Sequence, residues 1–265
     1  MSDYSLTRSQ IVDALQGLLE PRPEVKALWQ GGAAAFDRVD EWSDLDIIVM
    51  AKDDEVENVL KLVEDKLGEL SPIQSQLDLP QPTWHGHLQS FYRLENASPF
   101  LFIDLVVMKE SSPNRFIERQ IHGKALVHFD KGGYLEDDEL DIAAHLLKLR
   151  TRKQELESEF GFFQELTKKE LIRQNWLDAL PYFQRFTLAP IVELLRMQYS
   201  PGRYNFNLRY IYLDLPEEWV GRIEPLFFLQ PGKDFEEKFQ TAQQLYQDVL
   251  ADFDWKRVEA NLKAA

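Results

Sequence analysis

Up to residue 133, apolar residues recur first at helical spacing and then at strand spacing. Apolar positions over residues 11–19 repeat every three or four residues, which predicts a helix with Ser5 or Thr7 as its cap. A charged helix is expected over residues 53–67. Short apolar runs bounded by turn residues predict strands over residues 25–30, 44–51, 83–94, 99–108 and 125–129.

After residue 133 the strand signals mostly end and the pattern becomes helical. Apolar side chains step by alternating threes and fours along residues 142–163 and again along residues 235–253, as on the packed face of a long helix. Shorter helices are expected over residues 170–179 and 190–199. Breaks between them are expected at Pro181, Pro201-Gly202 and Pro216.

This order of elements predicts an α+β fold with two domains. A helix, two strands, a second helix and further strands indicate a small α/β domain with a mixed sheet over residues 1–135. A helical bundle is expected over residues 136–265. The chain length of 265 residues suits one large domain or two modest ones.

Composition narrows the functional classes. The chain carries 30 basic and 45 acidic side chains, a net charge of −15, which argues against nucleic-acid binding because phosphates call for a basic face. The lack of cysteine excludes disulfides, thiolate zinc sites, iron–sulfur clusters and cysteine nucleophiles. The apolar runs stop short of the ~20 residues that span a membrane, and the first residues lack the pattern of a signal peptide. A cytoplasmic protein without a membrane partner is expected.

Two acids open the second predicted strand. Asp44 and Asp46 are two residues apart, and because side chains alternate along a strand, both carboxylates point to one side. Two carboxylates held together repel each other unless a cation lies between them. Mg²⁺ fits this role, since it takes one or two carboxylates and completes its shell with water and substrate phosphates. The alternative is a capping pair at a solvated strand end.

A third acid, Asp104, interrupts the otherwise apolar run over residues 100–108. A lone ionised carboxylate in such a strand is costly unless it is paired or bound to a metal. If this strand lies beside the one that follows Asp44, the three acids converge. Three carboxylates can hold two metal ions ~3.5–4 Å apart, an arrangement that supports phosphoryl or nucleotidyl transfer. The alternative is a buried acid paired with an arginine.

Gly31 and Gly32 follow the first predicted strand and precede the strand of the acids. Without a side chain, their backbone N–H groups could come close to a phosphate. A glycine pair alone is weak evidence. Together with Asp44, Asp46 and Asp104 it forms a fairly specific combination.

This combination resembles the nucleotidyltransferase superfamily typified by DNA polymerase beta. The shared pattern is a hydrophobic strand ending in Gly-Gly or Gly-Ser, then Asp-x-Asp in a strand, and an aspartate in a later strand. The small branch that includes the aminoglycoside adenylyltransferases pairs such a domain with a C-terminal helical bundle. The resemblance therefore covers most of the chain, with its specific motifs between Gly31 and Asp104.

The resemblance implies roles for individual residues. Asp44, Asp46 and Asp104 would be catalytic and would bind Mg²⁺, with Asp104 as a further ligand or as the base that takes a proton from the acceptor hydroxyl. Gly31, Gly32 and Ser43 would lie around the triphosphate, and Arg173 resembles a polar residue at a similar place in the small transferases. Ala33, beside the glycines, and Lys153, the only charged residue on the apolar stripe over residues 142–163, are further candidates for nucleotide binding.

One position departs from the family pattern, which commonly reads Gly-Ser where this chain has Gly32-Ala33. The serine hydroxyl that would touch a phosphate oxygen is missing, and no basic residue stands beside it. Backbone donors survive the change, so nucleotide binding could persist.

Other candidate residues have structural alternatives. His85 and His87 could bind a metal from one strand face, or could form an ordinary polar strand face. Lys153 could reach phosphates, or could snorkel at the edge of the bundle. The aromatic and basic segment over residues 199–212 could stack on a base or clasp an acceptor, or could be a loop held against the bundle.

These observations predict an Mg²⁺-dependent nucleotidyltransferase that moves a nucleoside monophosphate, AMP from ATP in the leading hypothesis, to a hydroxyl of a small acceptor. The helical domain would form the acceptor wall, and the negative charge suggests a cationic acceptor through electrostatic steering. The alternative is an inactive nucleotide-sensing or partner-binding, antitoxin-like module on the same fold.

Overall fold

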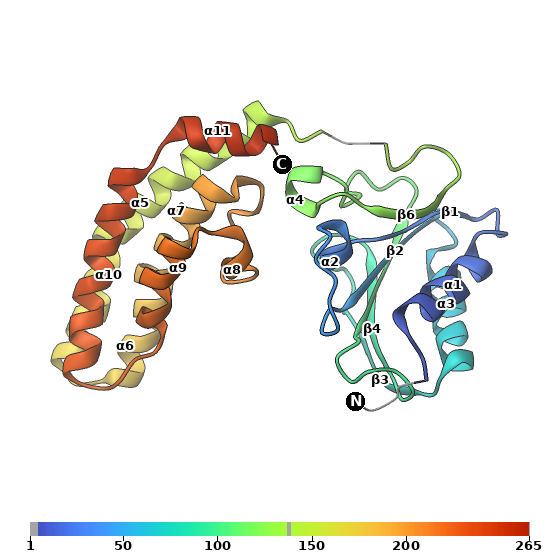
Figure 1. The fold of residues 1–265 in the computed structure, drawn as a ribbon, viewed down its shortest axis with the longest axis horizontal. Helices are drawn as coiled ribbons and strands as arrows, with labels where there is room; N and C mark the ends of the chain where they lie inside the picture. Colours follow the sequence, from blue (N-terminus) through green and yellow to red (C-terminus); the bar gives the residue numbers. More distant parts are fainter. Residues whose placement is uncertain (1–4, 137–138, 265) are drawn as a thin grey trace. The chain divides into compact units, whose positions relative to one another are not determined.

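The computed structural model describes residues 5–136 and 139–264 (Figure 1). The chain forms two compact units, residues 1–139 and 140–265. The first unit is built on a sheet and the second is helical, so the predicted α+β fold with a mixed sheet and a C-terminal helical region is confirmed.

The first unit alternates helices and strands. Its elements are α1 (Arg8–Leu19), β1 (Val25–Gln30), α2 (Gly32–Ala35), β2 (Leu45–Ala51), α3 (Val56–Leu70), β3 (Ile73–Asp78), β4 (Leu88–Leu94), β5 (Ile103–Lys109), α4 (Arg119–His122) and β6 (Leu126–Asp130). Thr7 caps α1, and its capping box includes the side chain of Gln10.

The six strands form one mixed sheet in the order β3-β4-β5-β2-β1-β6. β2 and β5 pair in parallel at its centre, and every other neighbouring pair is antiparallel. The parallel pair requires a long crossover, which α3 and the β3–β4 hairpin supply between β2 and β5.

The two faces of the sheet are covered differently. The first face packs against α1 and α3, which lie side by side in Figure 1, and buries a continuous apolar cluster that includes Leu15, Val63 and Leu105. The second face carries a smaller cluster that includes Trp29 and Ile48. Burial of such side chains stabilises the unit by roughly 25 cal/mol per Å² of apolar surface.

The second unit consists of helices around its own apolar core. The elements are α5 (Ile142–Ile172), α6 (Trp176–Phe183), the π-helical η1 (Gln184–Leu188), α7 (Ala189–Tyr199), η2 (Pro201–Arg203), α8 (Ile211–Asp214), α9 (Glu217–Ile223), η3 (Glu224–Phe227), α10 (Lys233–Asp252) and α11 (Trp255–Ala264). Phe183, Leu194 and Val249 are among its fully buried side chains.

Three expectations about local structure were wrong in the first unit. β3 was not predicted, because it is an edge strand with five of its six residues exposed and no apolar run. The strand expected over residues 83–94 begins only at Leu88, since Thr83 Oγ1 donates to the His87 carbonyl at 2.7 Å and closes a turn. The helix expected over residues 53–67 begins only at Val56 and continues past residue 67 to Leu70.

Two expectations were also wrong in the second unit. The helix expected over residues 170–179 is interrupted, because Gln174 has a φ of 61° and the Asn175 N–H bonds back to the Glu170 carbonyl at 2.9 Å. Pro181 lies inside α6 and does not break it.

Among the described residues, every helix is too short or too polar to cross a membrane.

Candidate functional site

Asp46 and Asp104 stand side by side on the two central strands. β2 and β5 pair in parallel with these two residues in register. Adjacent strands lie ~4.8 Å apart and paired residues project to the same face, so both carboxylates share one small area of the second face. The next residues on that face, Ile48 and Val106, belong to its apolar cluster. The acids therefore begin where this cluster ends.

Asp44 immediately precedes β2, after a tightly bonded turn. In this turn Ser43 Oγ donates to Asp40 Oδ1 at 2.6 Å, and the Trp42 N–H donates to the same oxygen at 3.1 Å. The Ser43 hydroxyl is the main cause of a lowered pKa at Asp40. Ser43, predicted to lie at the triphosphate, thus uses its hydroxyl to shape the turn that presents Asp44.

Arg8, at the start of α1, is hydrogen-bonded to the backbone of the same turn. Its Nη2 donates to the carbonyl of Ser43 and, at 2.8 Å, to the carbonyl of Asp44. Burial lowers the pKa of Arg8, and the charges of Asp46 and Asp44 oppose this shift. A guanidinium stays protonated in proteins, so Arg8 places a permanent positive charge next to the acids.

Gly32 lies directly against the Asp46 carboxylate. Its φ is +53°, and a Cβ at this position would stand 1.8 Å from Asp46 Oδ2. Both facts require glycine here. The N–H of the preceding Gly31 donates to the Asp46 carbonyl at 3.2 Å and extends the β1–β2 ladder. The glycine turn is thereby fixed at the side of Asp46 that faces away from Asp104.

A series of hydrogen bonds between side chains orients Asp104. Gln89 Nε2 donates to Asp104 Oδ1 at 2.7 Å, and Gln89 Oε1 lies 3.0 Å from His85 Nε2. His85 Nδ1 lies 3.1 Å from the His87 N–H, which can only donate, so Nδ1 accepts and Nε2 carries the proton. Gln89 therefore accepts from His85 and donates to Asp104, and this fixes the carboxylate.

Asp44, Asp46 and Asp104 supply some of the oxygen ligands that Mg²⁺ requires. Within residues 5–136 and 139–264, no three acidic or histidine side chains are arranged to hold a metal ion. Mg²⁺ needs only one or two carboxylates when water and substrate phosphates complete its shell. The registered pair Asp46 and Asp104, with Asp44 beside them, satisfies that smaller requirement. The chemistry of the site is therefore compatible with a metal that arrives together with a nucleotide.

The two predicted residues of the helical unit have local partners. Lys153 Nζ pairs with Glu157 on α5 at 2.7 Å and lies 5.0 Å from the centre of the Phe253 ring. Arg173 pairs with the buried Glu170 at 2.9 Å, and Asn175 bonds to the same carboxylate. These bonds, that of Asn175 first, lower the pKa of Glu170. The contact of Lys153 and Arg173 with a nucleotide stays a prediction.

The remaining candidates, His87 and the segment over residues 199–212, have structural roles within their own units. His87 is 2% exposed, packs on Phe116, and has its pKa lowered to about 4, mainly by burial and secondly by the electrostatic effect of the neighbouring His85 ring. A residue of this kind is a buried neutral imidazole. In the aromatic segment over residues 199–212, Arg196 of α7 binds the carbonyls of Asn207 and Arg209 and so fastens the loop to the helical core.

Arg8 and Gln89 were missed by the sequence analysis. Arg8 looks like an ordinary polar residue in the first turn of a helix, and its contact with Asp44 joins residues 36 positions apart. Gln89 lies in a strand that was predicted, two positions from Phe91, which stands opposite Asp104. Only the strand register identifies it, since glutamines are common on half-buried strands.

The chain is similar to solved structures of low sequence identity. No family model matches the chain, and no curated protein matches it. An aminoglycoside 6-adenyltransferase from Bacillus subtilis is a similar solved structure, with 12% identity, coverage of 97% of this chain and 92% of that chain, and a TM-score of 0.36. A nucleotidyltransferase-like protein from Exiguobacterium sibiricum has 13% identity, coverage of 92% and 75%, and a TM-score of 0.41.

Proposed function

We propose that the protein is a nucleotidyltransferase that moves AMP from ATP to a hydroxyl group of a small acceptor, with Mg²⁺ as its cofactor. The observation that carries the proposal is the registered pair of Asp46 and Asp104, with the Gly32 backbone against Asp46. It joins two acids on neighbouring strands to a glycine turn, as transfer of a charged phosphoryl group requires.

In the proposed reaction the acceptor oxygen forms a bond to the α-phosphorus of ATP. The bond between this phosphorus and the pyrophosphate oxygen breaks, and pyrophosphate leaves. The proton of the acceptor hydroxyl passes to the carboxylate of Asp104, which Gln89 holds in place. Asp44 and Asp46 would bind Mg²⁺, which would neutralise charge on the phosphates.

The glycine turn is the proposed phosphate side of the site. Because the Gly31 N–H already donates to Asp46, the amides of Gly32 and Ala33 are the better candidates for phosphate contact. The turn also explains how Ala33 could replace a serine, since a backbone donor does not depend on the side chain. Lys153, the only charged residue on the apolar stripe of α5, and Arg173, through the resemblance, are proposed as further nucleotide contacts.

The first experiment measures pyrophosphate release from ATP against a panel of hydroxyl-bearing acceptors, with and without Mg²⁺. Release that needs both the metal and an acceptor supports the transferase. Metal-dependent binding of ATP without turnover by any acceptor would instead identify the nucleotide-sensing alternative. Absence of ATP binding in every condition would contradict both.

The charge of the acceptor is a separate question. A cationic acceptor was expected from the net charge of −15 alone. The charges close to the acids bear on this more directly than the sum over the whole chain.

A further inference from the structure

The face that carries the acids continues as an apolar surface across β4 and β3. Phe91 of β4 stands directly opposite Asp104 and is itself opposite Leu77 of β3. Directly opposed side chains have Cβ atoms ~4.5–5.5 Å apart. One row of side chains therefore runs from Leu77 through Phe91 and Asp104 to Asp46.

A second row lies beside the first. Arg93 follows Phe91 by two positions on β4 and pairs with Ser75 of β3. Phe102 precedes Asp104 by two positions, and the Arg93 guanidinium carbon lies 5.5 Å from the centre of its ring. We call Leu77, Phe91, Arg93 and Phe102 the aromatic shelf.

The aromatic shelf is open and large enough for a small molecule. These residues line a hollow of about 330 Å³, within the ~300–1,000 Å³ of ligand pockets. Leu77 is 60% and Phe102 41% exposed. Exposed apolar side chains that gather beside a catalytic acid are typical of a binding surface for a flat apolar group.

Arg93 gives this surface a positive charge that the described residues do not neutralise. Its guanidinium packs on the Phe102 ring, and within the described part of the chain its buried Nε has no hydrogen-bond partner. A guanidinium packed on an aromatic ring is suited to bind a carboxylate or phosphate through two parallel hydrogen bonds. In a chain of net charge −15, such an arginine is conspicuous.

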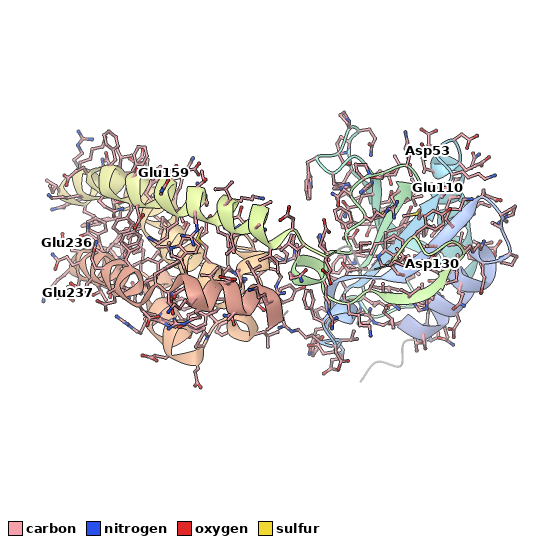
Figure 2. All side chains as sticks on the ribbon, turned by 90° about the horizontal axis from the view of Figure 1, so that it is seen from above. Asp53, Glu110, Asp130, Glu159, Glu236 and Glu237 are labelled. Carbon is pink, nitrogen blue, oxygen red and sulfur yellow. The ribbon has the colours of Figure 1, made fainter. Side chains whose placement is uncertain are left out.

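Several acids of the sheet unit are engaged in local structure. Figure 2 labels acids on both units, among them Asp53, Glu110 and Asp130 on the sheet unit. Asp53 binds Ser111, Glu110 pairs with Lys26, and Asp130 accepts backbone N–H groups of the following turn. The net charge is thus weak evidence for a cationic substrate.

The two sides of the acid pair differ in a way that assigns them different ligands. The glycine turn borders Asp46, and the aromatic shelf borders Asp104. The first offers backbone to phosphates, while the second offers rings and a guanidinium next to the proposed base. Resting on the proposed function, we propose that the aromatic shelf binds the acceptor, and that this acceptor carries a flat apolar body and an anionic group besides its hydroxyl.

The test compares two probes that share a phenol ring and differ in charge, 3-(4-hydroxyphenyl)propionate and tyramine. Binding to the full chain is measured by calorimetry without nucleotide. The anionic probe should bind about tenfold more tightly than the amine, as one charge-assisted pair predicts. Equal binding, or tighter binding of the amine, would overturn the proposal.

Variants then locate the binding. Arg93→Gln should weaken the anionic probe about tenfold and leave tyramine unchanged, whereas Arg93→Lys should restore part of the loss. Arg22→Gln, at an arginine that pairs with Glu24 in the turn after α1, is the matched control. Phe91→Ala should weaken both probes, and thermal melting checks that each variant is folded.

The same variants separate this proposal from the one on which it rests. If Phe91→Ala weakens ATP and not the phenols, the aromatic shelf is a nucleobase surface and the acceptor proposal is wrong. If the phenols bind as expected but no acceptor ever yields pyrophosphate, the shelf stands as a binding site and the transferase proposal fails.

Discussion

The two faces of the sheet contrast in how far their apolar cover extends. The first face is apolar along whole strands, from Leu45 to Ala51 in β2, because α1 and α3 cover it. The second face is apolar only up to Ile48 and Val106, and then changes to Asp46 and Asp104. The contrast teaches that charged side chains enter the central strands where the apolar cover of the sheet ends, and this is where we propose that the substrate binds.

Asp104 and Leu105 are neighbours in β5 but lie on opposite faces, so the contrast between the faces should be largest in their variants. Asp104→Asn should reduce transfer by about 10²–10⁴-fold, since it removes the proposed base, while the melting temperature stays close to that of the wild type. Pyrophosphate release and thermal unfolding measure the two effects. Undiminished turnover in this variant would remove Asp104 from the mechanism.

Leu105→Ala, one position along on the first face, should lower the stability of the protein and leave its activity unchanged. This side chain is fully buried in the first-face cluster, and its truncation should cost about 2–5 kcal/mol of unfolding free energy. The protein that remains folded should keep its turnover. Denaturant unfolding gives the cost, and a loss below ~1 kcal/mol would mean that the site collapses around the cavity.

Gly32→Ala tests the close approach at the edge of the acids. The added Cβ would collide with Asp46 Oδ2, and φ is positive, so we expect a loss of about 1–3 kcal/mol of stability together with reduced ATP binding. Gly17→Ala is the control, because it lies in α1 with nothing within 4 Å of a new Cβ. It should stabilise the chain by ~0.5–1 kcal/mol. Equal effects at both sites would contradict the described geometry.

The smallest effect concerns His87, under the covered part of the second face. The folded chain keeps it neutral down to about pH 4, while an unperturbed histidine titrates near 6.5. Between these values the unfolded chain binds more protons, so the free energy of unfolding should fall as the pH is lowered through this window. Burial also lowers the pKa of His122, His128 and His145, which adds to the fall.

In His87→Gln the unfolding free energy should depend less steeply on pH, because unfolding would take up as much as one proton fewer. Unfolding curves recorded between pH 4 and pH 7 measure this slope. A decline of the same slope in the variant would place the titration on the other histidines.

The sequence was sufficient to predict the central strands of the sheet, but not the edge strand β3. β1 was predicted with its observed bounds, and β2 and β5 to within a few residues, because strands that are buried on both faces are nearly continuous apolar runs. β3 escaped prediction because an exposed edge strand needs no apolar pattern. The interrupted helix near Gln174 escaped because its left-handed residue is not a glycine.

The acids themselves could be selected from the sequence, but their supports could not. Asp104 is conspicuous inside an apolar run, whereas Arg8, Gln89 and Arg93 are ordinary residues on polar positions. Their importance comes from strand register and from one long-range hydrogen bond. Such contacts depend on the tertiary fold, which a local pattern does not specify.

The most direct test of the account is calorimetric titration of ATP into the wild-type chain and Asp46→Asn, with and without Mg²⁺. The account predicts that wild-type binding requires the metal and that the variant loses at least about tenfold in affinity while remaining folded. Binding of equal strength in both proteins, independent of Mg²⁺, would contradict it.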